Sequence, residues 1–169
     1  SGHDAIFYND DQAWGDAIAS SVAASQRVQE WPSALARIAA LTRHDALGLL
    51  EASQLVLNFK GCGLPEAEVT GVLLRASSKL HTLTLFDGSP RRDNGGGEVP
   101  HWREAVAALA SALRGGGAAL TTLNFRHFHL GRDGGGVAAS LAVKPRLHTL
   151  RLVEVGLRAD ALALLLRGN

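Results

Sequence analysis

The sequence has one cysteine, no long apolar run and almost no net charge. Cys62 has no second cysteine with which to form an internal disulfide, so a secreted module stabilised by disulfides is not expected. A membrane span needs about 18 to 20 consecutive apolar residues. The longest candidate, 106–113, is followed at once by Arg114 and three glycines. A net charge of +1 predicts no chain-wide attraction to nucleic acid or to an anionic membrane.

The N-terminus lacks the pattern of a secretory signal, which is a basic region followed by an apolar stretch. We therefore expect a cytoplasmic (intracellular) protein with no membrane span and no nucleic-acid partner. The composition, which is rich in alanine, glycine and arginine, leaves open that the chain is an effector delivered into a host cell. A chain of 169 residues is long enough to bury one hydrophobic core.

Residue types that carry catalysis are present, but the sequence does not group them into a nucleophile with a base or into an acid–base pair. Glycine triplets occur at 95–97, 115–117 and 134–136. None is followed by the lysine and the serine or threonine that a phosphate-binding loop requires. We therefore predict that the protein is not an enzyme and uses no cofactor.

Four similar segments recur along the chain. They are QLVLNFKGCGL (54–64), LHTLTLFDGSP (80–90), LTTLNFRHFHL (120–130) and LHTLRLVEVGL (147–157). Their fourth positions are Leu57, Leu83, Leu123 and Leu150. The spacings are therefore about 26, 40 and 27 residues, and the first and last match the period of a leucine-rich repeat. Each segment is predicted to contribute one β-strand.

A helical pattern follows each segment, with apolar residues at spacings of three and four. The helical stretches are 65–77, 101–115, 135–144 and 158–168. Pro65 suits the first turn of a helix, and Gly115 and Gly168 stand where helices often end. The one long spacing is explained by residues 87–101, whose glycine, proline and charged residues predict a flexible insertion in one repeat.

The stretch CGLPEAEVTGVLLRASSKLHTLTL (62–85) resembles the ribonuclease-inhibitor-like class of leucine-rich repeats, which also occurs in cytosolic NOD-like receptors. The marks of the resemblance are the Cys-Gly-Leu junction and a strand–helix unit of about 28 residues. The resemblance covers 54–169 and implies an α/β solenoid, with a curved parallel sheet of about four strands and helices on its convex side. The later repeats depart from the pattern, because Gly88, Phe128 and Val155 replace the cysteine.

The first part of the chain, 1–53, shows no strand-like alternation and is predicted to form an all-helical N-terminal cap on the repeats of 54–169. Helical faces occur within 17–24 and 35–41, Trp31-Pro32 marks a break between helices, and Asp45 suits the cap of a helix over 46–52. No polar capping segment follows the last repeat. We therefore expect that the chain continues into a larger protein, or that this end is covered by a partner or by a second copy.

In a leucine-rich strand, the residues between the leucines face the concave surface. Aromatic and arginine side chains on such a surface are common anchors of protein interfaces. If the four segments share one register, Phe86 lies beside Arg126 and Val153. The residues predicted to bind a partner are Lys60, Thr84, Phe86, Asp87, Asn124, Arg126, His127, Arg151, Val153 and Glu154.

The run His127-Phe128-His129 is the most conspicuous candidate for a metal site. The strand pattern places His127 on the concave surface, Phe128 inward and His129 in the following turn, so the two histidines diverge. Because a metal site needs three or four converging ligands, we predict no metal. Cys62 stands at the turn position, where the resemblance implies a buried structural thiol rather than a nucleophile.

These observations predict a non-catalytic protein–protein recognition module that binds a protein partner through the concave face of its repeats. The alternative is an assembly or oligomerisation domain of a larger structural or scaffold protein, which would use the open end of the solenoid.

Overall fold

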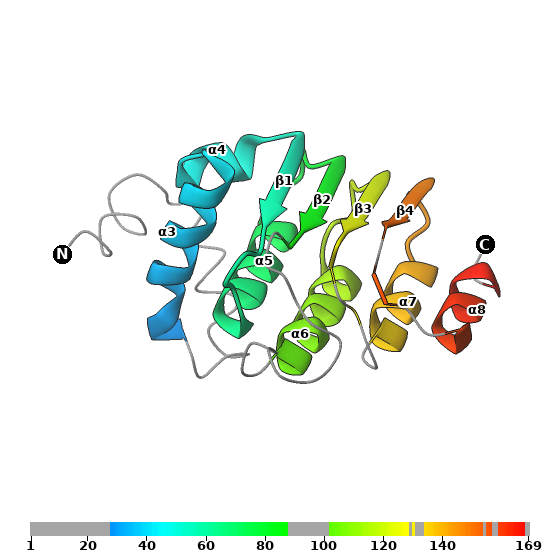
Figure 1. Cartoon of the computed structure of the whole chain (residues 1–169). Helices are drawn as coiled ribbons and strands as arrows, with labels where there is room; N and C mark the ends of the chain where they lie inside the picture. Colours follow the sequence, from blue (N-terminus) through cyan, green and yellow to red (C-terminus); the bar gives the residue numbers. More distant parts are fainter. Residues whose placement is uncertain are drawn as a thin grey trace.

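The computed structural model has an α/β architecture, in which helices cover one side of a parallel sheet (Figure 1). It describes residues 28–87, 102–128, 130, 134–153, 155–156 and 159–167. The predicted insertion at 87–101 lies outside these residues, apart from Asp87. The predicted helical face within 17–24 also lies outside them.

Four strands form one open sheet in the order β1-β2-β3-β4, and all neighbours are parallel. The strands are β1 (Gln54–Asn58), β2 (Thr82–Phe86), β3 (Thr122–Arg126) and β4 (Thr149–Val153). Each of the four similar segments contains one of them. The predicted parallel sheet of about four strands is therefore confirmed.

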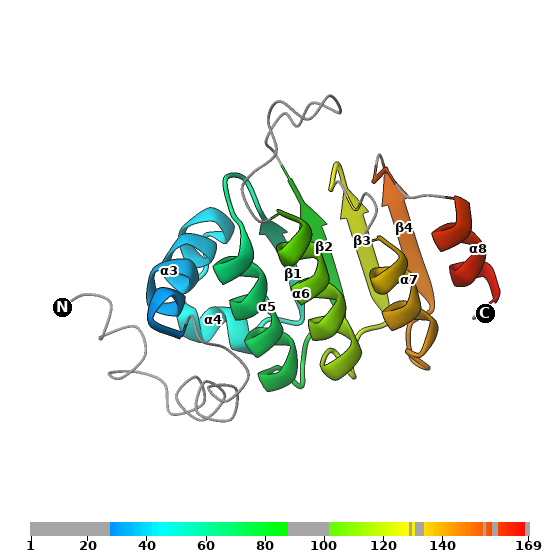
Figure 2. The same ribbon diagram turned by 90° about the horizontal axis from the view of Figure 1, so that it is seen from below.

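A helix follows each strand, and the helices lie side by side over one face of the sheet (Figure 2). They are α5 (Leu64–Ala76), α6 (Trp102–Gly115), α7 (Gly134–Ala142) and α8 (Ala159–Arg167). The predicted helices agree with these bounds to within about two residues, which is the usual scatter at helix ends.

The register of the sheet differs from the predicted one at β1. β2, β3 and β4 pair as the alignment of the segments predicts, with Leu83 opposite Leu123. In β1, Leu55 rather than Leu57 lies opposite Leu83, so the predicted alignment of this strand is wrong by two residues. A shift of two keeps every side chain on the same face. Because Leu55, Leu57 and Phe59 are all apolar, alternation did not distinguish the two registers.

The hydrophobic core lies between the sheet and its helices. Leu85, Leu123 and Phe125 alternate with outward residues along β2 and β3, and each is completely buried. The helices also approach one another closely, since a Cβ added at Gly71 of α5 would lie 3.1 Å from the Cβ of Ala112 in α6. Small residues at this crossing therefore set the spacing of the helices.

The glycine triplet 115–117 ends α6 and packs against the end of α5. A Cβ at Gly116 would lie 2.9 Å from the backbone nitrogen of Arg75. Gly117 has a φ of +70°, and its N–H donates to the carbonyl of Leu74 at 2.9 Å. These glycines thus provide close packing and a left-handed turn, which few other residues allow.

Three helical segments lie at the β1 end of the sheet: η2 (Val28–Glu30), α3 (Trp31–Thr42) and α4 (Ala46–Glu51). Trp31 and Leu35 of α3 are buried in the core. The predicted cap of α4 is confirmed, because the carboxylate of Asp45 accepts the N–H of Gly48. Of these segments, α3 packs against β1. The division of the chain at residue 53 stays a prediction.

Arg37 connects α3 to the turn between β1 and α5. Its guanidinium donates to the carbonyl of Gly61 at 3.0 Å and lies 3.5 Å from the carboxylate of Glu66. The same carboxylate accepts the N–H of Gly63 at 3.0 Å and so caps the start of α5. The buried carboxylate of Glu66 therefore contacts both Arg37 of α3 and the turn that leads into α5.

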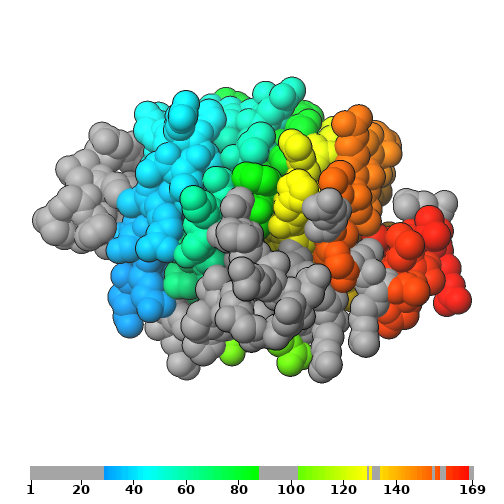
Figure 3. Space-filling view, in the orientation of Figure 1, coloured from blue at the N-terminus to red at the C-terminus, as the bar shows by residue number. Residues whose placement is uncertain are grey.

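The opposite end of the sheet is less covered. α8 packs against α7, and Figure 3 shows it at the far end of the molecule from α3. The inward leucines of β4, Leu150 and Leu152, are only partly buried, and Leu166 of α8 is 70% exposed. No described helix has the length and apolar character that crossing a bilayer requires.

Candidate binding surface on the sheet

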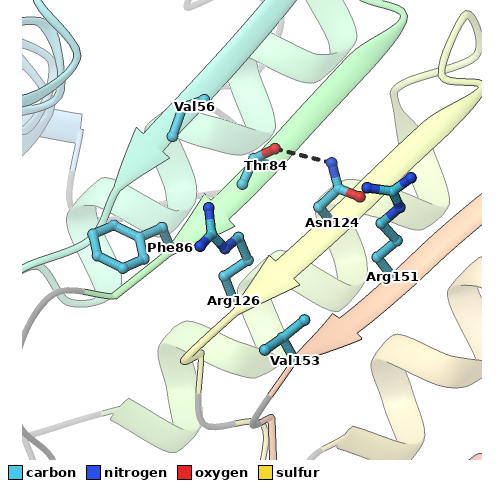
Figure 4. A pocket seen from close by; sticks show the side chains of 7 residues that line it. All are labelled: Val56, Thr84, Phe86, Asn124, Arg126, Arg151 and Val153. Carbon is cyan, nitrogen blue, oxygen red and sulfur yellow. Dashed lines mark hydrogen bonds between the residues drawn. The ribbon is translucent and has the colours of Figure 1, made fainter.

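The outward side chains of the four strands surround a hollow of about 500 Å³ on the face of the sheet that the helices leave uncovered (Figure 4). We call this surface the open sheet face. Its side chains are Val56, Thr84, Phe86, Asn124, Arg126, Arg151 and Val153.

Strand pairing arranges these side chains in two rows across the sheet. In one row, Phe86 lies opposite Arg126, and Arg126 lies opposite Val153. In the other row, Thr84 and Arg151 flank Asn124. Because neighbouring parallel strands lie about 4.8 Å apart, each row places its members within reach of a single ligand.

A side-chain hydrogen bond fixes the centre of the surface. Nδ2 of Asn124 donates to Oγ1 of Thr84 at 3.1 Å, as Figure 4 shows. Thr84 is only 9% exposed, so this contact lies at the floor of the hollow. Oδ1 of Asn124 is buried and has no hydrogen-bond partner among the described residues. The polar floor therefore holds an acceptor that remains to be satisfied.

The two arginines give the surface its charge. Arg126 and Arg151 are both exposed, and they rise from adjacent strands in Figure 4. Neither forms an ion pair with any residue that the structure describes. Guanidinium groups carry several donors in a fixed fork and bind carboxylates in a bidentate manner. The surface thus has the chemistry to bind an anionic group.

Apolar side chains complete the surface. Val56 is 59% exposed and Val153 is 44% exposed, which is unusual for large aliphatic side chains. Phe86 is half-buried, and its ring meets that of His127 edge to face at 6.3 Å between centroids. Such an arrangement of aromatic, aliphatic and arginine side chains is suited to contact with another protein.

Six of the ten residues predicted to bind a partner line this hollow. They are Thr84, Phe86, Asn124, Arg126, Arg151 and Val153. His127 is exposed directly after β3 and touches the surface through Phe86. Lys60 is exposed beyond the end of β1, since Asn58 rather than Lys60 lies opposite Phe86. Glu154 lies outside the described residues.

Asp87 was predicted on the exposed surface, and this placement is wrong. The side chain is 2% exposed. The N–H of Asp87 donates to the carbonyl of Arg126 at 3.3 Å, so the pairing of β2 with β3 continues one residue beyond Phe86. Because Asp87 is two residues after the inward Leu85, continued alternation turns it inward as well.

His127 occupies the corresponding position after β3 but behaves differently. Its φ is 51°, in the left-handed region that non-glycine residues rarely adopt. The strand's alternation is broken there, and the imidazole is exposed while Phe128 is completely buried. The predicted positions of His127 and Phe128 are therefore confirmed, and His129 lies outside the described residues.

Val56 is the one residue of the open sheet face that the predicted set omitted. Its outward direction followed from alternation, but an isolated valine in an apolar strand gave no sign of a binding role. The two-residue shift of β1 brings Val56 opposite Thr84 and so places it at the edge of the hollow.

Cys62 is completely buried at the start of the turn into α5, as predicted. Its Sγ lies 3.7 Å from the carbonyl oxygen of Lys60. Among the residues that the structure describes, no three side chains of His, Cys, Asp or Glu are grouped so as to hold a metal ion.

A second hollow, of about 570 Å³, lies between β4, α7 and α8, and we call it the C-terminal groove. It is lined by Leu141, Ala142, Leu147, His148, Thr149, Leu150, Leu152, Leu162, Leu165 and Leu166. Leucine dominates this lining and no arginine belongs to it, in contrast to the open sheet face.

A scan against protein-family models, a search of curated proteins and a search of solved structures each find no match to this chain. The resemblance to leucine-rich repeats therefore rests on the residues of the chain itself. The geometry of the two surfaces carries the functional argument.

Proposed function

We propose that this chain is a short leucine-rich-repeat solenoid and a non-catalytic recognition module, which binds a protein partner through the open sheet face. The observation that supports the proposal is the grouping of Phe86, Arg126 and Arg151 in one exposed hollow. Aromatic and arginine side chains dominate the energetics of known protein interfaces. A cytoplasmic setting belongs to the same proposal.

The proposed mechanism relies on rigidity. The binding side chains are carried by paired strands whose opposite faces are locked into the core, as at Leu85 and Phe125. Binding therefore requires little ordering of this chain, because its side chains are already held in place. The loss of conformational entropy on binding falls mainly on the partner. The Asn124–Thr84 hydrogen bond further restricts the side chains at the centre.

Affinity capture with the intact chain tests the proposal. Phe86→Ala combined with Arg126→Ala should weaken retention of the captured partner by more than about 2 kcal/mol, because both anchors are removed. The thermal midpoint should remain unchanged, since neither side chain belongs to the core.

A matched control is Val143→Ala combined with Arg146→Ala. Both residues are exposed between α7 and β4, away from the open sheet face. The control variant should capture the partner as the wild type does. Equal capture by the wild type and the Phe86/Arg126 variant would contradict the proposal.

The C-terminal groove favours a second candidate function, which is assembly, either with a second copy or within a larger scaffold. Leu162 and Leu166 of α8 both line this groove and are 45% and 70% exposed, and exposed leucines gathered in one hollow are typical of a contact surface. Sedimentation at increasing protein concentration tests self-association. A dimer that Leu162→Gln with Leu166→Gln abolishes would support this candidate, and a monomer at all concentrations would contradict self-association.

A further inference from the structure

The charge of the open sheet face has one sign. Two of its seven side chains are arginines and none is a carboxylate. The nearest acidic residue after β2, Asp87, is buried, and Glu154 lies outside the described residues. The ion pairs formed by described residues involve neither Arg126 nor Arg151. The two guanidinium groups therefore lack protein carboxylates in the part of the chain that the structure describes.

The arginines are spaced for an extended segment. Arg126 lies opposite Val153, and Arg151 lies opposite Asn124. The two arginines are therefore on adjacent strands and are offset by two residues along the strand direction. With about 4.8 Å between strands and about 3.3 Å per residue, their Cα atoms are roughly 8 Å apart. In an extended peptide, side chains at positions i and i+2 project from the same side and are about 7 Å apart. Two acidic residues at i and i+2 therefore match the two arginines.

Apolar side chains flank the arginines. Val56 and Phe86 lie on the side of β1 and β2, and Val153 lies beyond Arg126 on β4 (Figure 4). Burial of exposed aliphatic and aromatic surface stabilises a complex. A segment with apolar side chains beside its acidic pair would cover Phe86 and Val153, which neighbour Arg126 on the adjacent strands, as it pairs with the arginines.

We infer that the partner presents an extended acidic segment, with two carboxylates that bind Arg126 and Arg151 and apolar side chains that contact Phe86 and Val153. The inference rests on the proposed function, because it specifies the partner of the same surface.

A nucleic acid would also bring negative charge, but the surface fits it less well. The net charge of the whole chain is only +1, and three of the seven side chains are aliphatic or aromatic hydrocarbons. Non-specific binding to nucleic acid requires several phosphate contacts from a basic surface. Two arginines beside valines favour a protein segment.

Fluorescence anisotropy with synthetic peptides tests the inference. The acidic probe is a peptide of about eight residues in which Val, Glu, Glu and Leu alternate with Thr, as the alternation of an extended strand requires. Matched probes carry Gln or Lys in place of both Glu residues, and a fourth probe is an oligothymidylate. The wild type and two variants are titrated into each probe. The test variant is Arg126→Gln/Arg151→Gln. The control variant, Arg146→Gln/Arg167→Gln, removes two exposed arginines that lie outside the open sheet face.

The acidic peptide should bind the wild type at least about tenfold more tightly than the Gln peptide, a difference of about 1.4 kcal/mol. This preference should disappear in Arg126→Gln/Arg151→Gln, persist in the control variant and weaken at high salt. Arg126→Glu/Arg151→Glu should reverse it in favour of the Lys peptide. Circular dichroism verifies that each variant is folded.

The other outcomes overturn the inference in distinguishable ways. If the Gln or Lys peptide binds as well as the acidic one, and Phe86→Ala weakens it, the acidic segment is rejected while the proposed function stands. Preferential binding of the oligothymidylate rejects a protein segment. If no probe binds in a way that depends on Phe86, Arg126 or Arg151, both the inference and the proposed recognition of extended segments by this face are rejected.

Discussion

The two sides of a single strand, β3, differ in what they do. Leu123 and Phe125 point toward the helices and are completely buried, whereas Arg126 is exposed and Asn124 is half-buried on the open sheet face. Alternation thus assigns stability to one set of residues and leaves the other set free for binding. The comparison teaches that the two properties should be separable by substitutions at adjacent positions.

The largest expected effect is on the helix-facing side. Phe125→Ala should lower the free energy of unfolding by about 3–5 kcal/mol, because it removes a completely buried ring and leaves a cavity. The ring also packs against Phe128, with centroids 5.7 Å apart. Chemical denaturation measures the loss. Arg126→Ala, at the next residue, is the control and should change stability by less than about 0.5 kcal/mol.

A smaller loss of stability is expected at β4, where the side chains that face the helices are only partly buried. Leu152 is only partly buried, whereas Leu85 at the corresponding position of β2 is completely buried. Leu152→Ala should therefore cost about 1–2 kcal/mol, against about 3–4 kcal/mol for Leu85→Ala. Equal losses in denaturant titrations would contradict the open C-terminal groove, because they would require that Leu152 is covered in solution.

The smallest effect concerns the floor of the open sheet face. Thr84→Val keeps the shape of the side chain but removes the oxygen that accepts the amide of Asn124. The expected loss of stability is about 0.5–1.5 kcal/mol, the net value of one hydrogen bond. Thr82→Val on the same strand is the matched control and should be close to neutral. A loss equal to that of Phe125→Ala would place Thr84 in the core rather than at a binding surface.

Much of this architecture could be predicted from the sequence, because each strand and the helix that follows it form a short unit whose pattern is local. The four similar segments predicted the number of strands, and the leucines of the last three predicted the register of β2 to β4. The register of β1 could not be predicted, since Leu55, Leu57 and Phe59 are apolar at every second position and fit two alignments equally well.

The candidate site was predictable to the extent that it lies within strands. Phe86, Arg126 and Arg151 followed from alternation. The residues after the strands did not, because backbone torsion rather than side-chain type decides their direction. Asp87 continues the strand and turns inward, whereas His127 adopts a positive φ and turns outward. No pattern of residue types in the segments distinguishes these two outcomes.

The dissociation constant of the captured partner, measured for the wild type and for Phe86→Ala/Arg126→Ala, tests the central claim most directly. The account predicts a loss of at least about thirtyfold, equivalent to about 2 kcal/mol, with an unchanged thermal midpoint. An unchanged dissociation constant in the folded double variant would contradict binding through the open sheet face.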